Sequence, residues 1–132
     1  MFKIIYIVST LKKSGPTEVL LNIIKFLDRT KFEPTIVTLS PEVDATSISQ
    51  FEKNFNVPIF QLNMGRVSGI FLLKGRLTKI LNSIQPDVIH SQGFRPDLLV
   101  SLFFQNFKSV STIHNNPFAD YHYKHGKIIG SI

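Results

Sequence analysis

Two of the four histidines follow short strand-like stretches, where side chains of an open sheet can do chemistry. His90 ends the stretch Asp87–His90, and His114 follows Ser109–Ile113. A neutral imidazole at such a position can donate a hydrogen bond to a sugar hydroxyl or to a phosphate oxygen. The alternative for each is a buried histidine whose polar atoms are satisfied within the fold.

A third feature is Gly15, which ends the polar loop of residues 10–15 at the start of a predicted helix. Free N–H groups and the helix dipole can hold an anion there. Pro16 suits the first helical turn because its φ is fixed and its N–H is missing. Ser14 and Glu18 add a cap oxygen and a negative charge that the dipole favours. The alternative is a glycine required only by the geometry of the turn.

Other chemistries are excluded by composition or spacing. The chain has no cysteine, which excludes disulfides, thiolate metal sites and cysteine nucleophiles. Neither G-x-G-x-x-G nor G-x-x-x-x-G-K-[ST] occurs, and no His/Asp/Glu set has metal-ligand spacing, so we expect no metal and no cofactor. The net charge of +6 favours anionic partners. The basic residues are dispersed rather than interleaved with aromatics, so no nucleic acid is expected.

Alternating strands and helices must position these residues. Strands rich in β-branched residues are expected at Ile4–Ser9, Glu33–Leu39, Val57–Leu62, Asp87–His90 and Ser109–Ile113. Helices are expected from Pro16, over Thr46–Asn54, Gly69–Ile84 and Arg95–Phe104, and from Phe118. This alternation predicts an α/β fold with a doubly wound, Rossmann-like parallel sheet of about five strands in the order 3-2-1-4-5. The helix over Arg95–Phe104 is apolar nearly all round from Leu98 to Phe104, and we therefore expect it to be well buried.

The most basic region surrounds the predicted helix Gly69–Ile84 and contains Arg66, Lys74, Arg76 and Lys79. One interpretation is a solvent-exposed helix face with snorkelling cations. The other is contact with an anionic membrane surface or a phosphorylated acceptor. No apolar run approaches the roughly 20 residues of a membrane span, and no signal peptide is evident. We therefore expect a cytoplasmic protein, peripheral at the inner membrane face if the basic region contacts lipid.

Three segments in order resemble the family 4 glycosyltransferases of the GT-B fold. They are SGPTEVLLNIIKFL after the first strand, PDVIHSQG around the fourth and STIHNN at the end of the fifth. This group 1 family serves bacterial polysaccharide and lipopolysaccharide assembly. The resemblance covers essentially the whole chain but only the N-terminal part of the family's length. It implies that residues 1–132 are an incomplete, acceptor-side Rossmann-like domain and that the C-terminal, donor-binding domain is absent.

The implied reaction moves a sugar from a nucleotide sugar to a polysaccharide, lipopolysaccharide or lipid-linked acceptor, with retention and without a metal. By the resemblance, His114 lies beside the transferred sugar and is catalytic. The other implied site residues bind donor or acceptor: Gly15, Pro16, His90, Gln92 and Asn115. The 132-residue chain alone is expected to be inactive and to need a partner chain or to form a homodimer.

Two departures from the family pattern fall in these motifs. Many relatives read Gly-Gly-x-Glu where this chain has Gly15-Pro16-Thr17-Glu18, and His-x-His where it has His90-Ser91-Gln92. Gln92 donates and accepts hydrogen bonds but does not titrate. Two other functions remain open: a non-catalytic α/β binding module, or one subunit of a split glycosyltransferase. An ordinary nucleotide-binding Rossmann domain is disfavoured by the missing glycines.

Overall fold

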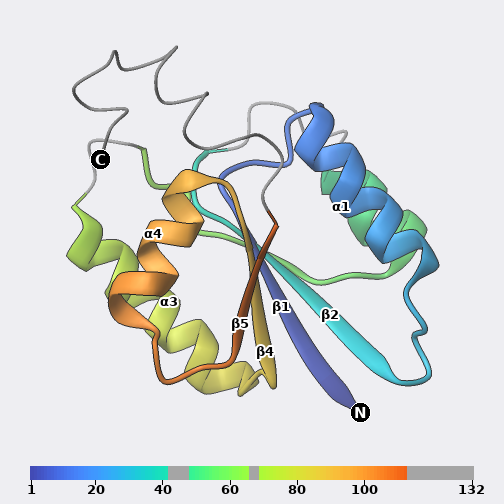
Figure 1. Cartoon of the computed structure of the whole chain (residues 1–132). Coiled ribbons are helices and arrows are strands. Elements are labelled where there is room, and N and C mark those ends of the chain that lie inside the picture. The colour runs from blue at the N-terminus through green and yellow to red at the C-terminus, as the bar shows by residue number, and fades with distance from the viewer. Residues whose placement is uncertain (42–47, 66–68, 113–132) are drawn as a thin grey trace.

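The computed structural model describes residues 1–41, 48–65 and 69–112. Its strands are β1 (Phe2–Val8), β2 (Phe32–Thr38), β3 (Ile59–Gln61), β4 (Val88–Gln92) and β5 (Ser109–Thr112). Its helices are α1 (Gly15–Phe26), the short π-helix η1 (Gln50–Asn54), α3 (Ile70–Ile84) and α4 (Phe94–Phe103). The strands form one sheet in the order β3-β2-β1-β4-β5, and every pair is parallel. The predicted fold class and strand order are confirmed (Figure 1).

Helices cover both faces of this sheet (Figure 1). On one face α3 and α4 pack over a core that includes Ile5 and Ile7 of β1. On the other face α1 and η1 pack over Tyr6 and Val8 of the same strand. Successive strand residues point to opposite faces, so β1 supplies both cores. A strand in this position must be apolar where both of its faces are covered, which explains the unbroken hydrophobic run of residues 4–8.

The helix predicted over Gly69–Ile84 is confirmed by α3. Leu73, Leu77 and Leu81 are its buried residues, and they face the sheet. The helix ends at Gln85, which adopts the left-handed conformation with φ 51° and ψ 63°. Pro86 follows and cannot continue the helix. Within the part of the chain that the structure describes, no helix is both long enough and apolar enough to cross a membrane.

The prediction that the fourth strand ends at His90 is wrong, because β4 continues to Gln92. Ser91 and Gln92 are paired with β1 on one side and with β5 on the other. Their polar side chains do not interrupt this ladder, since only backbone groups form it. The strand stops at Gly93, whose φ of 100° turns the chain.

The prediction that the helix before the fifth strand is well buried is also wrong. Leu99 and Val100 are buried in α4, but Leu98 is 38% exposed and Leu102 is 52% exposed. Only one side of α4 packs on the sheet. Beyond it, β5 is an edge strand as predicted, and its Val110 is 54% exposed.

The remaining differences concern short elements. Residues 46 and 47 lie outside the described residues, and the rest of the predicted second helix ends in η1, where Phe51 is buried. The third strand, Ile59–Gln61, is shorter than predicted, and the chain turns before and after it at Asn56 and Asn63, which have φ of 53° and 54°. Asparagine tolerates this left-handed conformation better than most residues. The helix predicted from Phe118 lies outside the described residues.

Candidate functional site

The carboxyl ends of parallel strands meet at one edge of the sheet, and a small pocket lies there between β1, β4 and the start of α1. We call it the edge pocket; its volume is about 180 Å³. None of the described residues that line it carries a charge. They are Val8, Ser9, Thr10, Ser14, Pro16, Thr17, Leu20, Gln92 and Gly93. Pro16 and Gln92, two of the predicted site residues, are therefore brought together.

The start of α1, which borders this pocket, is closed by its own side chains. The Ser14 hydroxyl accepts a hydrogen bond from the Thr17 N–H at 3.3 Å, and the Thr17 hydroxyl donates to a loop carbonyl at 2.6 Å. The Glu18 N–H donates to the Ser14 carbonyl at 3.0 Å, and Pro16 has no N–H. Of the N–H groups at this helix start, at most those of Ser14 and Gly15 remain for a ligand.

Gly15 is not required by the geometry of its turn. Its φ lies outside the left-handed range, and a Cβ at this position would meet no atom of the described chain within 4 Å. The alternative that Gly15 is required only by the geometry of the turn is therefore wrong. Gly15 precedes Pro16 but is not itself among the residues that line the edge pocket.

Gln92, the last residue of β4, is the polar side chain at this edge that most needs a partner. It is 4% exposed, and neither Oε1 nor Nε2 has a hydrogen-bond partner among the described residues. Leaving a buried polar group unpaired costs about 1–3 kcal/mol. Because the side chain lines the edge pocket, a ligand there can supply the missing hydrogen bonds.

His90 lies two residues inside β4 rather than at its end, and it does not line the edge pocket. Its half-buried ring lies against the ring of Tyr6, with centroids 5.1 Å apart, and Nε2 shares a hydrogen bond with the Thr112 hydroxyl. Burial raises the pKa of Tyr6, which keeps its phenol protonated. The binding role of His90 stays a prediction.

His114 and Asn115 lie outside the described residues, which end with Thr112 in β5. Their predicted roles beside the transferred sugar are untested by this geometry. In the described chain, no three His, Cys, Asp or Glu side chains gather into a possible metal site.

Residues 13–131 match the sequence profile of the family described as Glycosyltransferase Family 4. The chain belongs to glycosyltransferase family 4. The curated relatives that it matches include the O-antigen biosynthesis glycosyltransferase WclY of Escherichia coli, which is 37% identical over 130 residues. That match covers 96% of this family 4 chain and 32% of the relative, so the chain spans about a third of the relative's length.

Solved structures share the fold of this family 4 chain. A glycosyltransferase from Rickettsia africae ESF-5 superposes with a TM-score of 0.64 at 18% identity, over 95% of this chain and 34% of that protein. The S. aureus MnaA–UDP co-structure superposes with a TM-score of 0.63 at 16% identity, over 99% of this chain and 36% of that one. Both likenesses concern the Rossmann-like GT-B fold.

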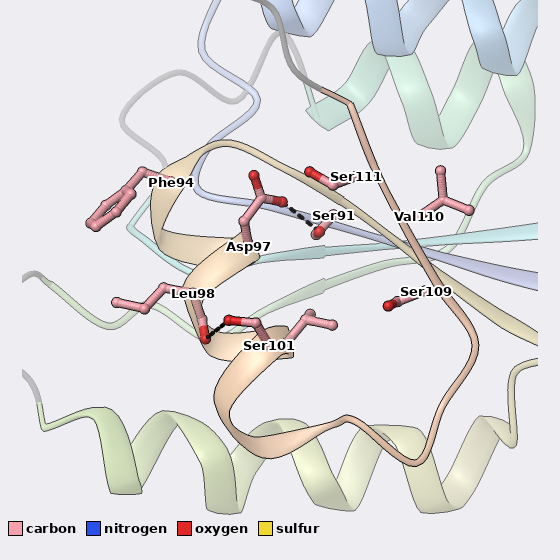
Figure 2. Close-up of a pocket in the computed structure, with 9 residues that line it drawn as sticks. Ser91, Phe94, Asp97, Leu98, Ser101, Ser109, Val110 and Ser111 are labelled. Carbon is pink, nitrogen blue, oxygen red and sulfur yellow. Dashed lines mark hydrogen bonds between the residues drawn. The ribbon is translucent and has the colours of Figure 1, made fainter. Parts of the chain in front are cut away.

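A larger groove lies between α4 and β5 in this family 4 chain, and Figure 2 shows its lining. Its volume is about 450 Å³. The Ser91 hydroxyl donates to Asp97 at 2.5 Å across it, and Ser109 and Ser111 project from the edge strand (Figure 2). The sequence interpretation missed this groove. Its only signal was the alternation of serines in the fifth strand, which is equally typical of a solvated edge.

Arg95, also missed, holds three segments of the chain together near the carboxyl edge. Its guanidinium donates to the Ser40 hydroxyl at 2.8 Å and to the carbonyls of Met64 and Gly65 at 3.0 and 3.1 Å. These partners follow β2 and β3, so Arg95 ties the loops of two strands to the start of α4. No local pattern signals such a contact, because the partners lie 30 to 55 residues away.

The predicted basic region forms a separate surface. Lys74, Arg76 and Lys79 are exposed on α3, whereas Arg66 lies outside the described residues. Lys74 Nζ lies 5.0 Å from the centroid of the Phe103 ring, and Arg76 donates to the Leu62 carbonyl at 3.0 Å. The first turn of α3 adds Phe71 and Leu72, which are 75% and 54% exposed.

Proposed function

We propose that this chain is the acceptor-side domain of a glycosyltransferase that moves a sugar from a nucleotide sugar to a glycan or lipid-linked acceptor. The observation that carries the proposal is the 37% identity, over 96% of the chain, to a glycosyltransferase of O-antigen biosynthesis. The edge pocket supports it, because open α/β sheets bind ligands outside the carboxyl ends of their strands.

The chemistry divides unequally between this chain and the rest of such an enzyme. An oxocarbenium-like transition state and a departing nucleoside diphosphate need electrostatic stabilisation. The edge pocket has an uncharged lining, and the start of α1 has at most the Ser14 and Gly15 N–H groups to offer. Most of the stabilisation is therefore assigned to a C-terminal, donor-binding domain, with His114 acting from this side beside the transferred sugar.

The test uses the full-length protein that contains this sequence. It is incubated with a panel of nucleotide sugars and with lipid-linked and oligosaccharide acceptors, and the glycosylated product is detected by mass spectrometry. Transfer of one sugar, with retention at its anomeric carbon, is the expected result. Binding without transfer would support the non-catalytic module instead, and transfer only after addition of a second chain would support a split enzyme.

We also propose that α3 contacts an anionic membrane surface, where lipid-linked acceptors reside. The exposed side of α3 presents Lys74, Arg76 and Lys79, the helix contains no acidic residue, and the exposed Phe71 and Leu72 adjoin these cations. Cations beside exposed apolar side chains are typical of helices that bind the membrane interface.

Vesicle co-sedimentation of the full-length protein tests this contact. Binding should be stronger to vesicles that contain phosphatidylglycerol than to phosphatidylcholine alone. One cation contributes about 1 kcal/mol near such a surface, so Lys79→Gln should weaken binding about fivefold. Lys53→Gln in η1, which packs on the other face of the sheet, is the control and should bind like wild type. Equal binding by all three proteins would refute the contact.

A further inference from the structure

We propose that the edge pocket binds a neutral sugar hydroxyl through the Gln92 carboxamide, and not a phosphate. This inference rests on the proposed function and assigns the chemistry of its pocket. The start of a helix is by itself a weak sign of a ligand site. The independent observation is Gln92, a carboxamide 4% exposed that has no hydrogen-bond partner among the described residues and lines the same pocket.

The charges around the pocket disfavour an anion. No described lining residue is charged, and Lys12 and Lys13 in the neighbouring loop are exposed and do not line the pocket. Glu18 in the first turn of α1 is also exposed and does not line the pocket. At most the Ser14 and Gly15 N–H groups are available there, because Pro16 has none and the Thr17 N–H is bonded to Ser14, whereas phosphate sites at helix starts rely on several N–H groups.

The hydrogen-bonding capacity of Gln92 matches a hydroxyl better than a phosphate. A carboxamide has two N–H donors and one carbonyl acceptor. An ionised phosphate ester only accepts hydrogen bonds, so it would satisfy Nε2 and leave Oε1 buried without a partner among the described residues. A sugar hydroxyl both donates and accepts, and it can satisfy both ends. The hydroxyls of Ser14 and Thr17 are already engaged with each other and with the backbone.

The size and lining of the pocket fit part of a sugar ring. Its volume of about 180 Å³ is several times the roughly 30 Å³ that one water occupies in the liquid. Val8, Pro16 and Leu20 provide apolar walls beside the polar Gln92. A sugar ring has the same two characters, with C–H groups on its faces and hydroxyls at its rim. The hydroxyl belongs either to the acceptor or to the transferred sugar.

The first experiment replaces Gln92 in the full-length enzyme and measures both kinetics and stability. Gln92→Leu keeps a similar size and removes both polar groups. The KM of one sugar substrate should rise about tenfold or more, because a buried hydrogen bond to that substrate is lost. The melting temperature should stay the same or rise, because an unpartnered buried carboxamide has been replaced by an apolar group. Unchanged KM values for both substrates, or a lower melting temperature without a kinetic effect, would overturn the inference.

Thr38→Val is the matched control. Thr38, at the end of β2, is also fully buried, and its Oγ1 has no partner among the described residues, but it does not line the edge pocket. This nearly isosteric variant should keep or raise the melting temperature like Gln92→Leu. Its KM values should equal those of wild type. A rise in KM for the control as large as that for Gln92→Leu would show that the effect does not come from the pocket.

The second experiment identifies the hydroxyl with monodeoxy analogues of the acceptor and of the donor sugar. With the wild-type enzyme, the analogue that lacks the recognised hydroxyl should have a kcat/KM about as low as that of Gln92→Leu with the intact substrate. With Gln92→Leu, the same analogue and the intact substrate should have the same kcat/KM. The analogue series that shows this behaviour tells whether acceptor or donor is bound. If every analogue lowers kcat/KM by the same factor in Gln92→Leu as in wild type, the inference is overturned.

A third measurement separates this inference from the proposed function. Titration calorimetry of the full-length protein compares methyl glycosides with inorganic phosphate. Binding of a methyl glycoside that weakens at least tenfold in Gln92→Leu supports the pocket even if wild type transfers no sugar, which would refute only the proposed function. Binding of phosphate that depends on Gln92 would overturn the inference and leave the proposed function intact.

Discussion

Replacing Arg95 with alanine should lower the free energy of unfolding by about 2 kcal/mol. The guanidinium makes two partly buried hydrogen bonds, to the Ser40 hydroxyl at 2.8 Å and to the Met64 carbonyl at 3.0 Å. Each contributes about 1 kcal/mol net. The third bond, to the Gly65 carbonyl at 3.1 Å, is exposed and adds little. Arg95→Lys should recover less than half of the loss, because one ammonium cannot reach three acceptors as a planar fork does.

The effect should be local to the carboxyl edge. The Met64 N–H bonds to the Leu39 carbonyl at 2.8 Å, and Arg95 holds the loop that contains it. Hydrogen–deuterium exchange of the full-length protein, followed by mass spectrometry, should show up to about 30-fold faster exchange in peptides that cover residues 62–65. Arg29→Ala is the control. Its two bonds to backbone carbonyls at 2.7 and 3.1 Å are both exposed, so it should cost less than about 1 kcal/mol. Equal losses in the two variants, or unchanged exchange in Arg95→Ala, would refute the reasoning.

Three further predictions concern other parts of the chain. Burial raises the pKa of Tyr6 above 10.0, so at higher pH the phenol loses its proton in the unfolded state before it does so in the folded state. In urea unfolding, the free energy of unfolding of wild type should therefore fall faster with rising pH than that of Tyr6→Phe, and parallel curves for the two proteins would contradict this. In the full-length enzyme, His114→Ala should lower turnover at least tenfold, or about 1.4 kcal/mol in the barrier, with an unchanged melting temperature; the opposite pattern would mark a structural residue. Residues 1–132 alone should dimerise or aggregate through the uncharged edge strand β5 and should transfer no sugar. A stable, inactive monomer in light scattering would refute the argument from the edge strand. A monomer that transfers sugar would refute the two-domain proposal.

The fold was predictable because its signals are local and repeated. The alternation of short β-branched stretches with helical periods predicts a parallel doubly wound sheet whatever the details of packing. The cap at Ser14 and the helix predicted over Gly69–Ile84 depend on residues within a few positions of one another, and both are confirmed. Helix ends and helix faces of this kind are determined by residues that are close together in the sequence.

The features that escaped prediction depend on distant partners. Gln92 looked like a loop residue because its side chain is polar, yet pairing with β1 and β5 keeps it in the strand. The exposure of Leu98 and Leu102 depends on which elements lie beside α4, which composition does not report. Gln92 has no hydrogen-bond partner among the described residues, and this is visible only in three dimensions because its neighbours are distant in the sequence. The roles of His114 and Asn115 rest on the family resemblance.

The closed start of α1 also bears on the entropy of binding. The bonds between Ser14, Thr17 and the Lys12 carbonyl hold residues 12–17 in one conformation before any ligand arrives. Pro16 stiffens the same turn further. A ligand that enters beside it therefore orders little additional backbone, and ordering of loops is one of the main costs of association. A pocket built in this way can discriminate between ligands with a single hydrogen-bonding side chain, since little binding energy is consumed in shaping the site.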